Sequence, residues 1–393
     1  MTTRPTQIAI LGSTGSIGCR ALDVIRDLGP ERARVAALVG NSNVDLLWKQ
    51  VSEHRPGFVG VTDAAAFMEF QGHLQAQGGA VPALSGGPAA LLEAVEWEGI
   101  DCVVVATVGA IGLRATLRAI ERGLRIAIAN KEVLVCAGDL VTAAAAKHGA
   151  QILPIDSEHA AIFQCLTGHR CEDVRRLLLT SSGGPFRSAT LEEMRRATRA
   201  EALAHPTWQM GEKITIDSAT MMNKGLEIIE AHHLFGVSEE QIDVVVHPES
   251  IVHSMVEFQD NTVLAQLSTT DMYLPILCAL TWPERVANPV PPLDFAALGQ
   301  LTFEEPDPVR FPCLALARRA IAEGGTAPAV LNAANEIAVA HFLAEEITLL
   351  EIPTMIERAL DAHTSTPSPG LEEILAADAW ARREVEALCA SAS

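Results

Sequence analysis

Between residues 7 and 155 the chain repeats one pattern, a short continuous apolar run followed by an amphipathic helical stretch. Continuous apolar strands that alternate with helices are typical of a parallel sheet with both faces covered. A strict apolar–polar alternation would instead indicate a sheet with one face in water. The pattern therefore predicts an α/β domain built on a parallel sheet. The expected strands are 7–11, 34–39, 58–61, 102–107, 125–129 and 151–155.

A different pattern begins near residue 156, where short strands mix with helices and loops. This mixture indicates an α+β domain, with a long helix after Asp217. Prolines gather between 283 and 312, which predicts an extended linker, and the rest of the chain has helical periodicity. Strands are expected at 176–180, 241–246, 254–257 and 263–267, and helices of a C-terminal bundle at 313–323, 330–344, 352–362 and 376–391. The predicted segments are 1–155, 156–285, the linker 286–310 and the helical bundle 311–393.

The charge balance limits the class of partner. The chain carries 29 Lys and Arg against 49 Asp and Glu, a formal net charge of −20. Such a chain is not expected to bind nucleic acid or an anionic membrane through its overall field. Any phosphate group that it binds needs a local site.

Apolar runs and cysteines bear on the compartment. No apolar run reaches the roughly 18 residues of a membrane span, and a strand pattern starts at Gln7, so no signal or transit peptide is expected. The eight cysteines are scattered without a CxxC pair. This distribution argues against a disulfide scaffold or a structural zinc site, and it predicts a cytoplasmic protein with reduced thiols.

The first strand runs directly into a glycine-rich segment, GSTGSIG at Gly12–Gly18, which precedes a helix. Glycines let the backbone turn sharply and approach a pyrophosphate, whose charge the helix N-terminus stabilises. The spacing is GxxGxxG rather than the commoner GxGxxG, but the strand–turn–helix context is the one that such a motif needs. The segment predicts a Rossmann-like dinucleotide site, with a purely structural turn as the alternative.

The end of the second strand bears on the choice of dinucleotide. It reads Gly40-Asn41-Ser42-Asn43, where NAD enzymes usually place an acid for the ribose 2′-hydroxyl. The lack of an acid removes a group that would repel a 2′-phosphate, so NADP is favoured over NAD. No Lys or Arg occupies this tip either, so the expected preference is moderate.

Two acids follow the last strand of the parallel sheet, in Asp156-Ser157-Glu158. If the chain stays extended, both carboxylates point to one side and would need a cation between them. Hard oxygen ligands of this kind suit Mg²⁺ or Mn²⁺. The alternative is a helix start, with Asp or Ser as the N-cap and Glu158 in the first turn.

A third acid lies on the helix expected after Asp217. Asn223 and Glu227 are four residues apart and Lys224 and Glu227 three apart, so the three share one helical face. A cation and an amide beside a carboxylate suit a site that binds both a phosphate and a metal ion. An ordinary surface Lys–Glu pair is the alternative, which the flanking Met and Ile residues disfavour.

Three loops complete the set of candidates. Ser181–Pro185, SSGGP, offers amides and hydroxyls to an anion, although such a turn needs no function. Residues 205–211, HPTWQMG, suit a closing lid, unless Trp208 simply packs against the body. Lys131 follows a parallel strand, where ligand sites of α/β folds lie, but could also be a surface lysine at a strand end.

Together these segments resemble the 1-deoxy-D-xylulose 5-phosphate reductoisomerase family over essentially the whole chain. The matching blocks occur in order as GSTGSIG at 12–18, NKE at 130–132, DSEH at 156–159, SSGGPF at 181–186, HPTWQMG at 205–211, DSATMMNKGLE at 217–227, HPESIVHSMVEF at 247–258 and LNAANE at 331–336. The resemblance implies a homodimer whose subunit has an NADPH domain, a central catalytic and dimerising domain and a C-terminal four-helix bundle. It also implies rearrangement and NADPH reduction of 1-deoxy-D-xylulose 5-phosphate to 2-C-methyl-D-erythritol 4-phosphate, in isoprenoid biosynthesis.

The resemblance implies a role for individual residues. Asp156, Glu158 and Glu227 would bind one Mg²⁺ or Mn²⁺ per subunit. The phosphate of the small sugar substrate would be held by Ser182, Ser218, Asn223 and Lys224, with His205 nearby. Lys131 and Ser157 would contact the substrate's oxygens, and Trp208 and Met210 would close over it. The cofactor would contact Thr14, Gly15, Ser16, Ile17, Gly40, Ser42, Asn43, Asn130, Glu132 and Gly211.

Some positions depart from the family, and two other functions compete. Ser42 stands where the family often has a basic residue, and Glu249 and Thr270–Tyr273 also differ, away from the expected ligands. A semialdehyde or acyl-phosphate dehydrogenase would need an activated cysteine, which no loop motif here supplies. A non-catalytic NADPH sensor would have no use for three converging acids.

Overall fold

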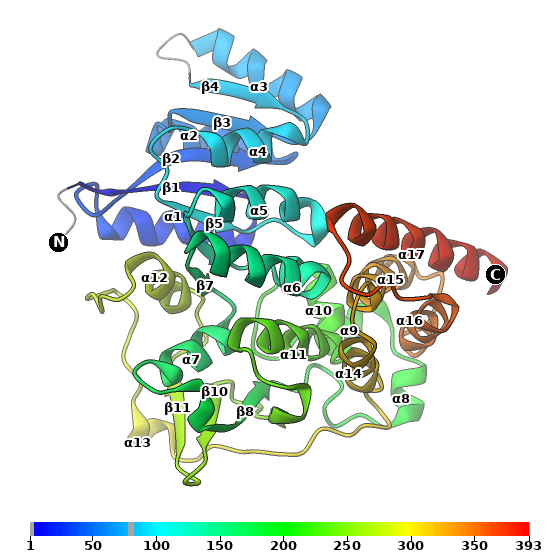
Figure 1. Cartoon of the computed structure of the whole chain (residues 1–393). Helices are drawn as coiled ribbons and strands as arrows, with labels where there is room; N and C mark the ends of the chain where they lie inside the picture. Colours follow the sequence, from blue (N-terminus) through cyan, green and yellow to red (C-terminus); the bar gives the residue numbers. More distant parts are fainter. Residues whose placement is uncertain (1–3, 78–81, 393) are drawn as a thin grey trace. The chain divides into compact units, whose positions relative to one another are not determined.

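The computed structural model describes residues 4–77 and 82–392, which form two compact units (Figure 1). Unit 1 comprises Met1–Val133, Val141–Ala160 and Asp271–Val290, and unit 2 comprises Leu134–Leu140, Ala161–Thr270 and Pro291–Ser393. Helices α6 (Lys131–His148) and α7 (Ser157–Leu166) pass from one unit into the other. The structure thus groups residues 271–290 with the N-terminal part of the chain, whereas the four consecutive segments of the sequence analysis remain a prediction.

Unit 1 is built on a seven-stranded sheet in the order β4-β3-β2-β1-β5-β6-β7. Every pair in it is parallel, which confirms the predicted α/β fold. Strand β4 is the one that the sequence analysis missed. The strands are β1 (Thr6–Leu11), β2 (Ala33–Gly40), β3 (Phe58–Val61), β4 (Ala83–Gly86), β5 (Cys102–Val105), β6 (Arg125–Ile128) and β7 (Ile152–Pro154).

The register of the strands brings several candidate residues to one edge of this sheet. Leu11 pairs with both Val39 and Val105, so β1, β2 and β5 end level with one another. Val105 in turn pairs with Ile128, which pairs with Pro154 of β7. The segments that follow Leu11, Val39, Ile128 and Pro154 therefore leave the same carboxyl edge. Ligands of open α/β sheets bind at this edge, where the strand order reverses.

Helices cover both faces of the sheet of unit 1. Helices α1, α2, α3 and α12 lie on one face, and α4 and α5 pack together on the other (Figure 1). Helix α12 packs against α1, where the Tyr273 hydroxyl donates to Asp27 at 3.0 Å and Arg20 pairs with Asp271. Their bounds are α1 (Ser16–Leu28), α2 (Val44–His54), α3 (Ala64–Gln77), α4 (Ala89–Glu96), α5 (Leu113–Glu121) and α12 (Tyr273–Thr281), with a 3-10 turn at Gly109–Gly112.

Unit 2 contains a second, mixed sheet in the order β11-β10-β8-β9, as the α+β pattern predicted. Strands β8 and β9 are parallel, while β10 is antiparallel to both of its neighbours. The four strands are β8 (Val174–Ser181), β9 (Ile242–Val246), β10 (Val252–Phe258) and β11 (Val263–Leu267).

One apolar core joins this sheet to the C-terminal helices. It includes Leu177 of β8, Leu226 and Ile229 of α11, Val330 of α15 and Ile356 of α16. The predicted helical bundle is therefore present but shares its core with the rest of unit 2. The helices of unit 2 are α8 (Leu191–Arg195), α9 (Arg199–Ala202), α10 (Glu212–Ala219), α11 (Met222–Phe235), α13 (Phe295–Leu298), α14 (Cys313–Glu323), α15 (Ala327–Leu343), α16 (Glu351–Ala362) and α17 (Leu371–Ala392), with 3-10 turns at Cys171–Asp173 and Glu239–Gln241.

Within the described residues, no helix has the length and apolar character needed to cross a membrane.

Candidate active site

The glycine-rich turn of unit 1 is held in a conformation that only glycine fits. The amides of Gly12 and Ser13 both donate to Val39 O, at 2.8 and 2.9 Å. Gly12 has φ +88°, and a Cβ on it would lie 2.4 Å from Ala106 O. A Cβ on Gly18 would lie 2.3 Å from Gly12 O. These close approaches fold the turn tightly against the ends of β2 and β5.

The same turn leaves a helix N-terminus open to a ligand. Helix α1 starts at Ser16, and its N-cap residue Gly15 provides no side chain to cap the first amides. A Cβ on Gly15 would find no atom closer than 3.4 Å, so the backbone there is open to close approach. Free first-turn amides and a positive helix end are what a pyrophosphate needs. The residues present therefore fit a dinucleotide, in line with the prediction for Thr14–Ile17.

The tip of β2 lies beside this turn. A Cβ on Gly40 would be 3.4 Å from Thr14 Cγ2, so the two segments adjoin. Asn43 is the N-cap of α2, and its Oδ1 accepts from Leu46 N at 3.1 Å. Ser42 and Asn43 are exposed. Unit 1 thus brings Thr14, Gly40, Ser42 and Asn43 together, as the sequence analysis expected.

Asn130 has a structural role that the sequence analysis did not see. Its Oδ1 caps α6 by accepting from Val133 N at 3.1 Å, and its Nδ2 donates to Thr107 Oγ1 and Gly109 O, both at 2.9 Å. The amide thereby ties the end of β6 to the end of β5. The next residue, Lys131, is buried and lies 2.6 Å from Asp156 Oδ2 through its Nζ. This burial is inconsistent with the alternative of a surface lysine.

Of the two backbone conformations considered for Asp156-Ser157-Glu158, the structure shows the helix start and not the extended chain. Helix α7 begins at Ser157, and the amide of Ala160 donates to Asp156 O at 2.8 Å, so Asp156 stands just before the first turn. Glu158 lies in that turn and accepts a hydrogen bond from Ser157 Oγ. The helix-start alternative is therefore correct, because acids favour the positive end of a helix. Two carboxylates still come from one helix end, with Lys131 offsetting part of their charge.

The long helix expected after Asp217 is α11, which starts at Met222, while Asp217 itself lies in the preceding helix α10. Met221 adopts a left-handed conformation, φ +58°, between α10 and α11. The break places Ser218 in the last turn of α10 and Asn223 and Lys224 in the first turn of α11. The side chain of Met221 makes no capping hydrogen bond to the start of α11. The first turn of α11 therefore begins beside these polar side chains, and its Met222 amide donates to Thr220 Oγ1 at 3.3 Å.

Asn223, Lys224 and Glu227 share one face of α11, as predicted. Asn223 Nδ2 donates to Glu227 Oε1 at 2.5 Å, and Lys224 Nζ forms an ion pair with Glu227 Oε2. The side chains of Lys224 and Glu227 are only 3% and 1% exposed. The pair is therefore not the ordinary surface salt bridge that was the alternative. Burying two charges is costly unless they are paired and hydrogen-bonded, which is the case here.

The SSGGP loop packs against the end of α10. Gly184 has φ +66°, and a Cβ there would lie 2.4 Å from Ser218 O. Ser182 Oγ is 3.0 Å from His205 Nε2, and His205 Nδ1 accepts from Trp208 N at 2.9 Å. Nε2 is therefore the ring nitrogen that carries the proton and donates to Ser182. Burial lowers the pKa of His205, which favours its neutral form. Unit 2 thus brings Ser182, His205 and Ser218 together.

The segment 205–211 has no helix or strand of its own. Trp208 is half-buried, and its ring centroid is 6.3 Å from that of His253, so this side chain packs partly against the body. Met210 is half-buried, and Gly211 is the exposed N-cap of α10. The role of this segment as a lid remains a prediction.

One supporting residue escaped the sequence analysis. Asp217 in α10 is 1% exposed, and its carboxylate binds Lys213 Nζ at 2.9 Å and Asn335 Nδ2 at 2.8 Å. Asn335 lies on α15, so these contacts fix α10 against the C-terminal helices. Asp217 and Asn335 both belong to sequence blocks that match the family. Their contact could not be predicted, because 118 residues separate them and no spacing rule connects them.

The three predicted metal ligands are all carboxylates. Asp156 and Glu158 lie in unit 1, and Glu227 lies in unit 2. Carboxylate oxygens suit Mg²⁺ or Mn²⁺ rather than a soft metal. The chemistry of the residues therefore fits the predicted ion.

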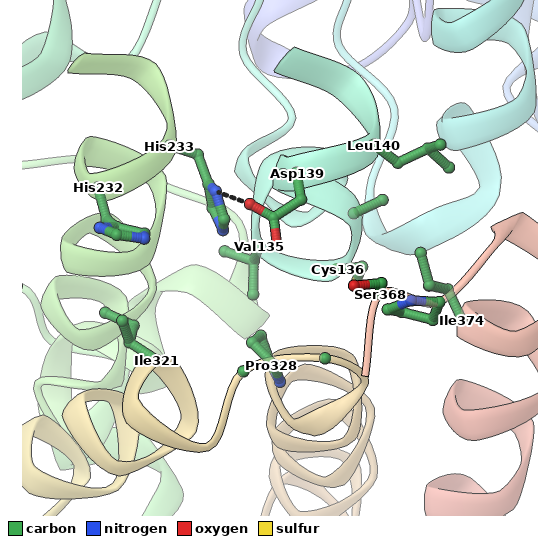
Figure 2. Close-up of a pocket in the computed structure, with 15 residues that line it drawn as sticks. Val135, Cys136, Asp139, Leu140, His232, His233, Ile321, Pro328, Ser368 and Ile374 are labelled. Carbon is green, nitrogen blue, oxygen red and sulfur yellow. Dashed lines mark ion pairs between the residues drawn. The ribbon is translucent and has the colours of Figure 1, made fainter. Parts of the chain in front are cut away.

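Unit 2 also has a cavity of about 350 Å³ apart from these residues (Figure 2). Helix α6 is kinked there, at Ala137, and a Cβ on Gly138 would lie 2.1 Å from the ring of His233. His233 Nδ1 is 3.5 Å from Asp139 Oδ1 (Figure 2). Burial and the neighbouring His232 lower the pKa of His233 to about 4, against the opposing effect of Asp139.

This pKa predicts a loss of stability in acid. An unfolded His233 takes up a proton near its ordinary pKa of about 6.5, whereas the folded one does so only near 4. Neutral His233 therefore makes its full contribution to the free energy of unfolding above about pH 6.5. This contribution is lost as the pH drops towards 4, by up to about 3 kcal/mol. His233→Asn should flatten that slope in urea unfolding at pH 7, 5.5 and 4.5. His148→Asn, at an exposed position, is the control, and equal slopes for H233N and wild type would contradict the prediction.

Sequence profiles of known families match most of the chain. The profile described as 1-deoxy-D-xylulose 5-phosphate reductoisomerase matches residues 8–138, and that of its C-terminal domain matches 152–235. A third, described as DXP reductoisomerase C-terminal domain, matches 267–384.

Curated relatives and solved structures agree with these profiles. The chain is 54% identical to 1-deoxy-D-xylulose 5-phosphate reductoisomerase of Symbiobacterium thermophilum, covering 95% of this chain and 96% of that one. It is 51% identical to that of Prosthecochloris aestuarii, over 97% and 99%. The Zymomonas mobilis enzyme in complex with NADPH has a TM-score of 0.91 at 45% identity, over 98% and 99%. A structure of DOX-P reductoisomerase with NADPH, fosmidomycin and magnesium has a TM-score of 0.93 at 45% identity, over 98% of each chain.

Proposed function

This chain belongs to the 1-deoxy-D-xylulose 5-phosphate reductoisomerase family, and from that premise we propose how its own residues divide the work of the reaction. The enzyme converts 1-deoxy-D-xylulose 5-phosphate to 2-C-methyl-D-erythritol 4-phosphate with NADPH and a divalent metal ion, in isoprenoid biosynthesis. One observation carries the proposal for its residues. A buried lysine and an amide share a carboxylate at the start of α11, beside the serine loop.

Asp156, Glu158 and Glu227 are the proposed ligands of the metal ion. When bound, the divalent ion supplies Lewis-acid polarisation of the substrate carbonyl, and the nicotinamide supplies the hydride. The three carboxylates set the charge and hardness of this site. Lys131, which lies 2.6 Å from Asp156, and Ser157 are proposed to donate to the substrate's oxygens and so to orient the carbon skeleton for its rearrangement.

Ser182, Ser218, Asn223 and Lys224 are the proposed phosphate site, with His205 beside it. Hydroxyls, an amide and an ammonium donate to phosphate oxygens, and the start of α11 adds a positive helix end. These contacts are remote from the bonds that change. Their binding energy therefore orients the reacting end of the substrate. Trp208 and Met210 are proposed to close over it and exclude water.

The cofactor is proposed to lie along the carboxyl edge of the sheet in unit 1. First-turn amides of α1 would bind the pyrophosphate. The ribose would lie at the tip of β2, because this is where the second strand of such folds meets it. The proposed contacts are Thr14, Gly15, Ser16, Ile17, Gly40, Ser42, Asn43, Asn130, Glu132 and Gly211.

The direct test follows NADPH absorbance with 1-deoxy-D-xylulose 5-phosphate and Mn²⁺. We expect oxidation of NADPH that stops with a chelator and resumes when Mn²⁺ is restored in excess. Oxidation that is indifferent to the chelator would refute the metal site. Oxidation without formation of the branched polyol phosphate would refute the assigned reaction.

Three of the buried thiols argue against the cysteine-based alternative. Burial raises the pKa of Cys102 and Cys313 to about 12 and that of Cys165 to about 11. A thiol with a raised pKa is a poor nucleophile, because the thiolate is the reactive form. The metal-dependent activity should therefore survive iodoacetamide.

A homodimer is the proposed assembly, with β11 as the contact surface. Strand β11 forms one edge of the sheet of unit 2, and the side chains of Val263 and Leu264 are 45% and 36% exposed. An open edge strand offers unpaired backbone groups to a second copy. At the opposite edge of this sheet, Val246 of β9 instead forms an antiparallel β-bridge with Glu304.

Leu264→Lys is expected to weaken the dimer at least about tenfold, because a lysine on an edge strand opposes edge-to-edge pairing. Light scattering after size exclusion, over a dilution series, measures the change. Leu92→Lys is the matched control, since Leu92 is 38% exposed on α4 of unit 1. A wild-type mass of 41.9 kDa at all concentrations would contradict the dimer.

The cytoplasm is the proposed compartment. None of the eight cysteines, all of which lie in the described part of the chain, forms a disulfide, and five of them are buried. Reduced thiols of this kind are typical of proteins outside oxidising compartments.

A further inference from the structure

Residues 302–310 contact the loop that carries Ser182. They fall in the stretch that the sequence predicts as a linker, yet their hydrogen bonds converge on residues 181–189 of unit 2. We propose that this clasp segment, residues 302–310, positions the serine loop for phosphate binding, with Arg310 as its main positioning residue. The inference rests on the proposed phosphate site and extends it to side chains that do not touch the substrate.

The serine loop, residues 181–185, has few hydrogen bonds of its own. Gly183 and Gly184 have φ of +81° and +66°, and glycine loses more conformational freedom than any other residue when it is ordered. Gly183 N donates to Ser181 Oγ at 3.1 Å, and Gly184 N donates to Ser182 Oγ at 3.2 Å. Both bonds lie within the loop. Its place in unit 2 therefore depends on contacts with other segments.

The hydroxyl of Ser182 shows why this place matters. Its Oγ accepts from Gly184 N, and it also accepts from His205 Nε2 at 3.0 Å. With two donors directed at it, the oxygen keeps its own hydrogen for an outside acceptor, such as a phosphate oxygen. A shift of the loop would turn that hydrogen away from the phosphate.

The clasp segment acts on the start of the loop through the end of β9. Strands β8 and β9 are parallel, with Ser181 opposite Val246. The backbone of Val246 exchanges two hydrogen bonds with Glu304, both at 2.9 Å. The amide of the next residue, His247, donates to Ser181 O at 2.6 Å. The His247 ring is buried, and its Nδ1 donates to Thr302 O at 2.8 Å, so the clasp segment holds the residue that anchors Ser181.

Arg310 binds the other end of the loop. Its Nη1 donates to Arg187 O and to Ala189 O, both at 2.8 Å. Its Nε donates to Asp307 Oδ2 at 2.8 Å, which fixes the orientation of the guanidinium. A hydrogen bond with a charged donor is roughly twice as strong as one between neutral groups. One side chain thus holds the backbone that follows the two glycines.

An ion pair between Arg187 and Glu304 connects this end of the loop to the same segment. The two side chains are 35% and 42% exposed, so the pair contributes little by itself. It keeps Arg187 over the glycine turn, where a Cβ on Gly183 would lie 2.8 Å from Arg187 Cδ. The main share of the positioning therefore falls to Arg310.

A loop that is already held in the free enzyme binds a phosphate without a further ordering cost. Without Arg310, the phosphate itself would have to order residues 181–189, and this cost would weaken its binding. At saturating substrate the bound phosphate keeps the loop in place, so kcat changes less than KM. This split between KM and kcat distinguishes a positioning role from a general loss of stability.

The test is Arg310→Gln in the full-length protein. The KM for 1-deoxy-D-xylulose 5-phosphate and the inhibition constant of inorganic phosphate should both rise about tenfold, which corresponds to about 1.4 kcal/mol. The kcat and the dissociation constant of NADPH should stay within about threefold of the wild type. Arg310→Lys keeps the charge but not the planar fork that reaches two carbonyls, so both constants should rise about threefold.

Arg318→Gln is the matched control. Arg318 also lies in the C-terminal part of unit 2 and donates to a carbonyl of the second sheet, Ile242 O at 2.7 Å, but at the opposite end of β9. Its side chain is 34% exposed, against 24% for Arg310. R318Q should lose stability and keep both constants within about twofold of the wild type.

The inference is wrong if R310Q keeps both constants within about twofold of the wild type, or if R318Q raises them as much as R310Q does. If R310Q does not fold, unchanged constants in R310K overturn it in the same way. Ser182→Ala separates this failure from a failure of the site itself. If S182A weakens inhibition by phosphate and R310Q does not, the phosphate site stands and the role of the clasp segment is refuted. If neither S182A nor K224Q weakens this inhibition, the proposed phosphate site fails as well.

Discussion

Glu227→Gln is expected to lower kcat by about a thousandfold while the dissociation constant of NADPH stays within about twofold. The substitution keeps the shape of the side chain and an oxygen that can accept from Asn223, which now donates to Glu227 at 2.5 Å. It removes the negative charge that a metal ligand needs. Loss of Lewis-acid catalysis costs several kcal/mol of transition-state stabilisation, which is the size of the expected effect. Initial rates at saturating substrate and Mn²⁺, with a separate NADPH titration, measure both quantities.

A matched control separates the loss of a ligand from the loss of a buried charge. Glu257 in β10 is also buried, and it pairs with Arg175 and Arg176. Glu257→Gln should reduce stability but leave kcat nearly unchanged, because its partners lie outside the proposed site. If E227Q retains wild-type turnover at saturating Mn²⁺, the ligand assignment is wrong.

Lys224→Gln is expected to lower kcat/KM for 1-deoxy-D-xylulose 5-phosphate by about ten- to a hundredfold. A charge-assisted hydrogen bond to phosphate contributes roughly 1.5–3 kcal/mol, and here it is formed at a buried position. The variant should also be less stable by about 3 kcal/mol or more, because Glu227 loses its partner in the interior. Steady-state kinetics and thermal unfolding measure the two effects.

Lys213→Gln is the control for the loss of stability that is expected of K224Q. Lys213 pairs with the buried Asp217 as Lys224 pairs with Glu227, but it is not among the proposed phosphate ligands. K213Q should therefore lose stability and keep its KM. Inhibition by inorganic phosphate gives an independent measure, since K224Q should weaken it and K213Q should not. Equal KM values for K224Q and K213Q would contradict the phosphate role.

The strands of unit 1 were predictable because their signal is local. Runs such as Cys102–Val105 are short, continuous and apolar, as strands buried on both faces must be. Strand β4 was missed because Ala83–Gly86 forms an edge of the sheet, where only Ser85 is buried. A strand with so little apolar surface leaves no periodic pattern to detect.

The site was predictable in its residue types and less so in its backbone. The helical face of Asn223, Lys224 and Glu227 follows from spacing alone, and the structure confirms it. The break at Met221 does not follow, because a left-handed methionine has no sequence signature. The hydrogen bond between Asn335 and Asp217 joins helices that are distant in sequence, and only tertiary packing determines it. The variants proposed above test which residues of the two units contact a ligand.

The packing of α12 on α1 has a consequence for the way this protein is made. Residues 271–290 complete unit 1, and Tyr273 and Asp271 bind side chains of α1. A nascent chain that has left the ribosome only as far as β7 therefore lacks a helix that covers one face of its first sheet. The part of that face which α12 covers, over β6 and β7, stays exposed until more than a hundred further residues, including the strands of unit 2, have been translated. Because translation proceeds from the N-terminus, unit 1 cannot complete its folding before residues 271–290 have been made. A gene fragment that ends after β7 should therefore yield an aggregation-prone product.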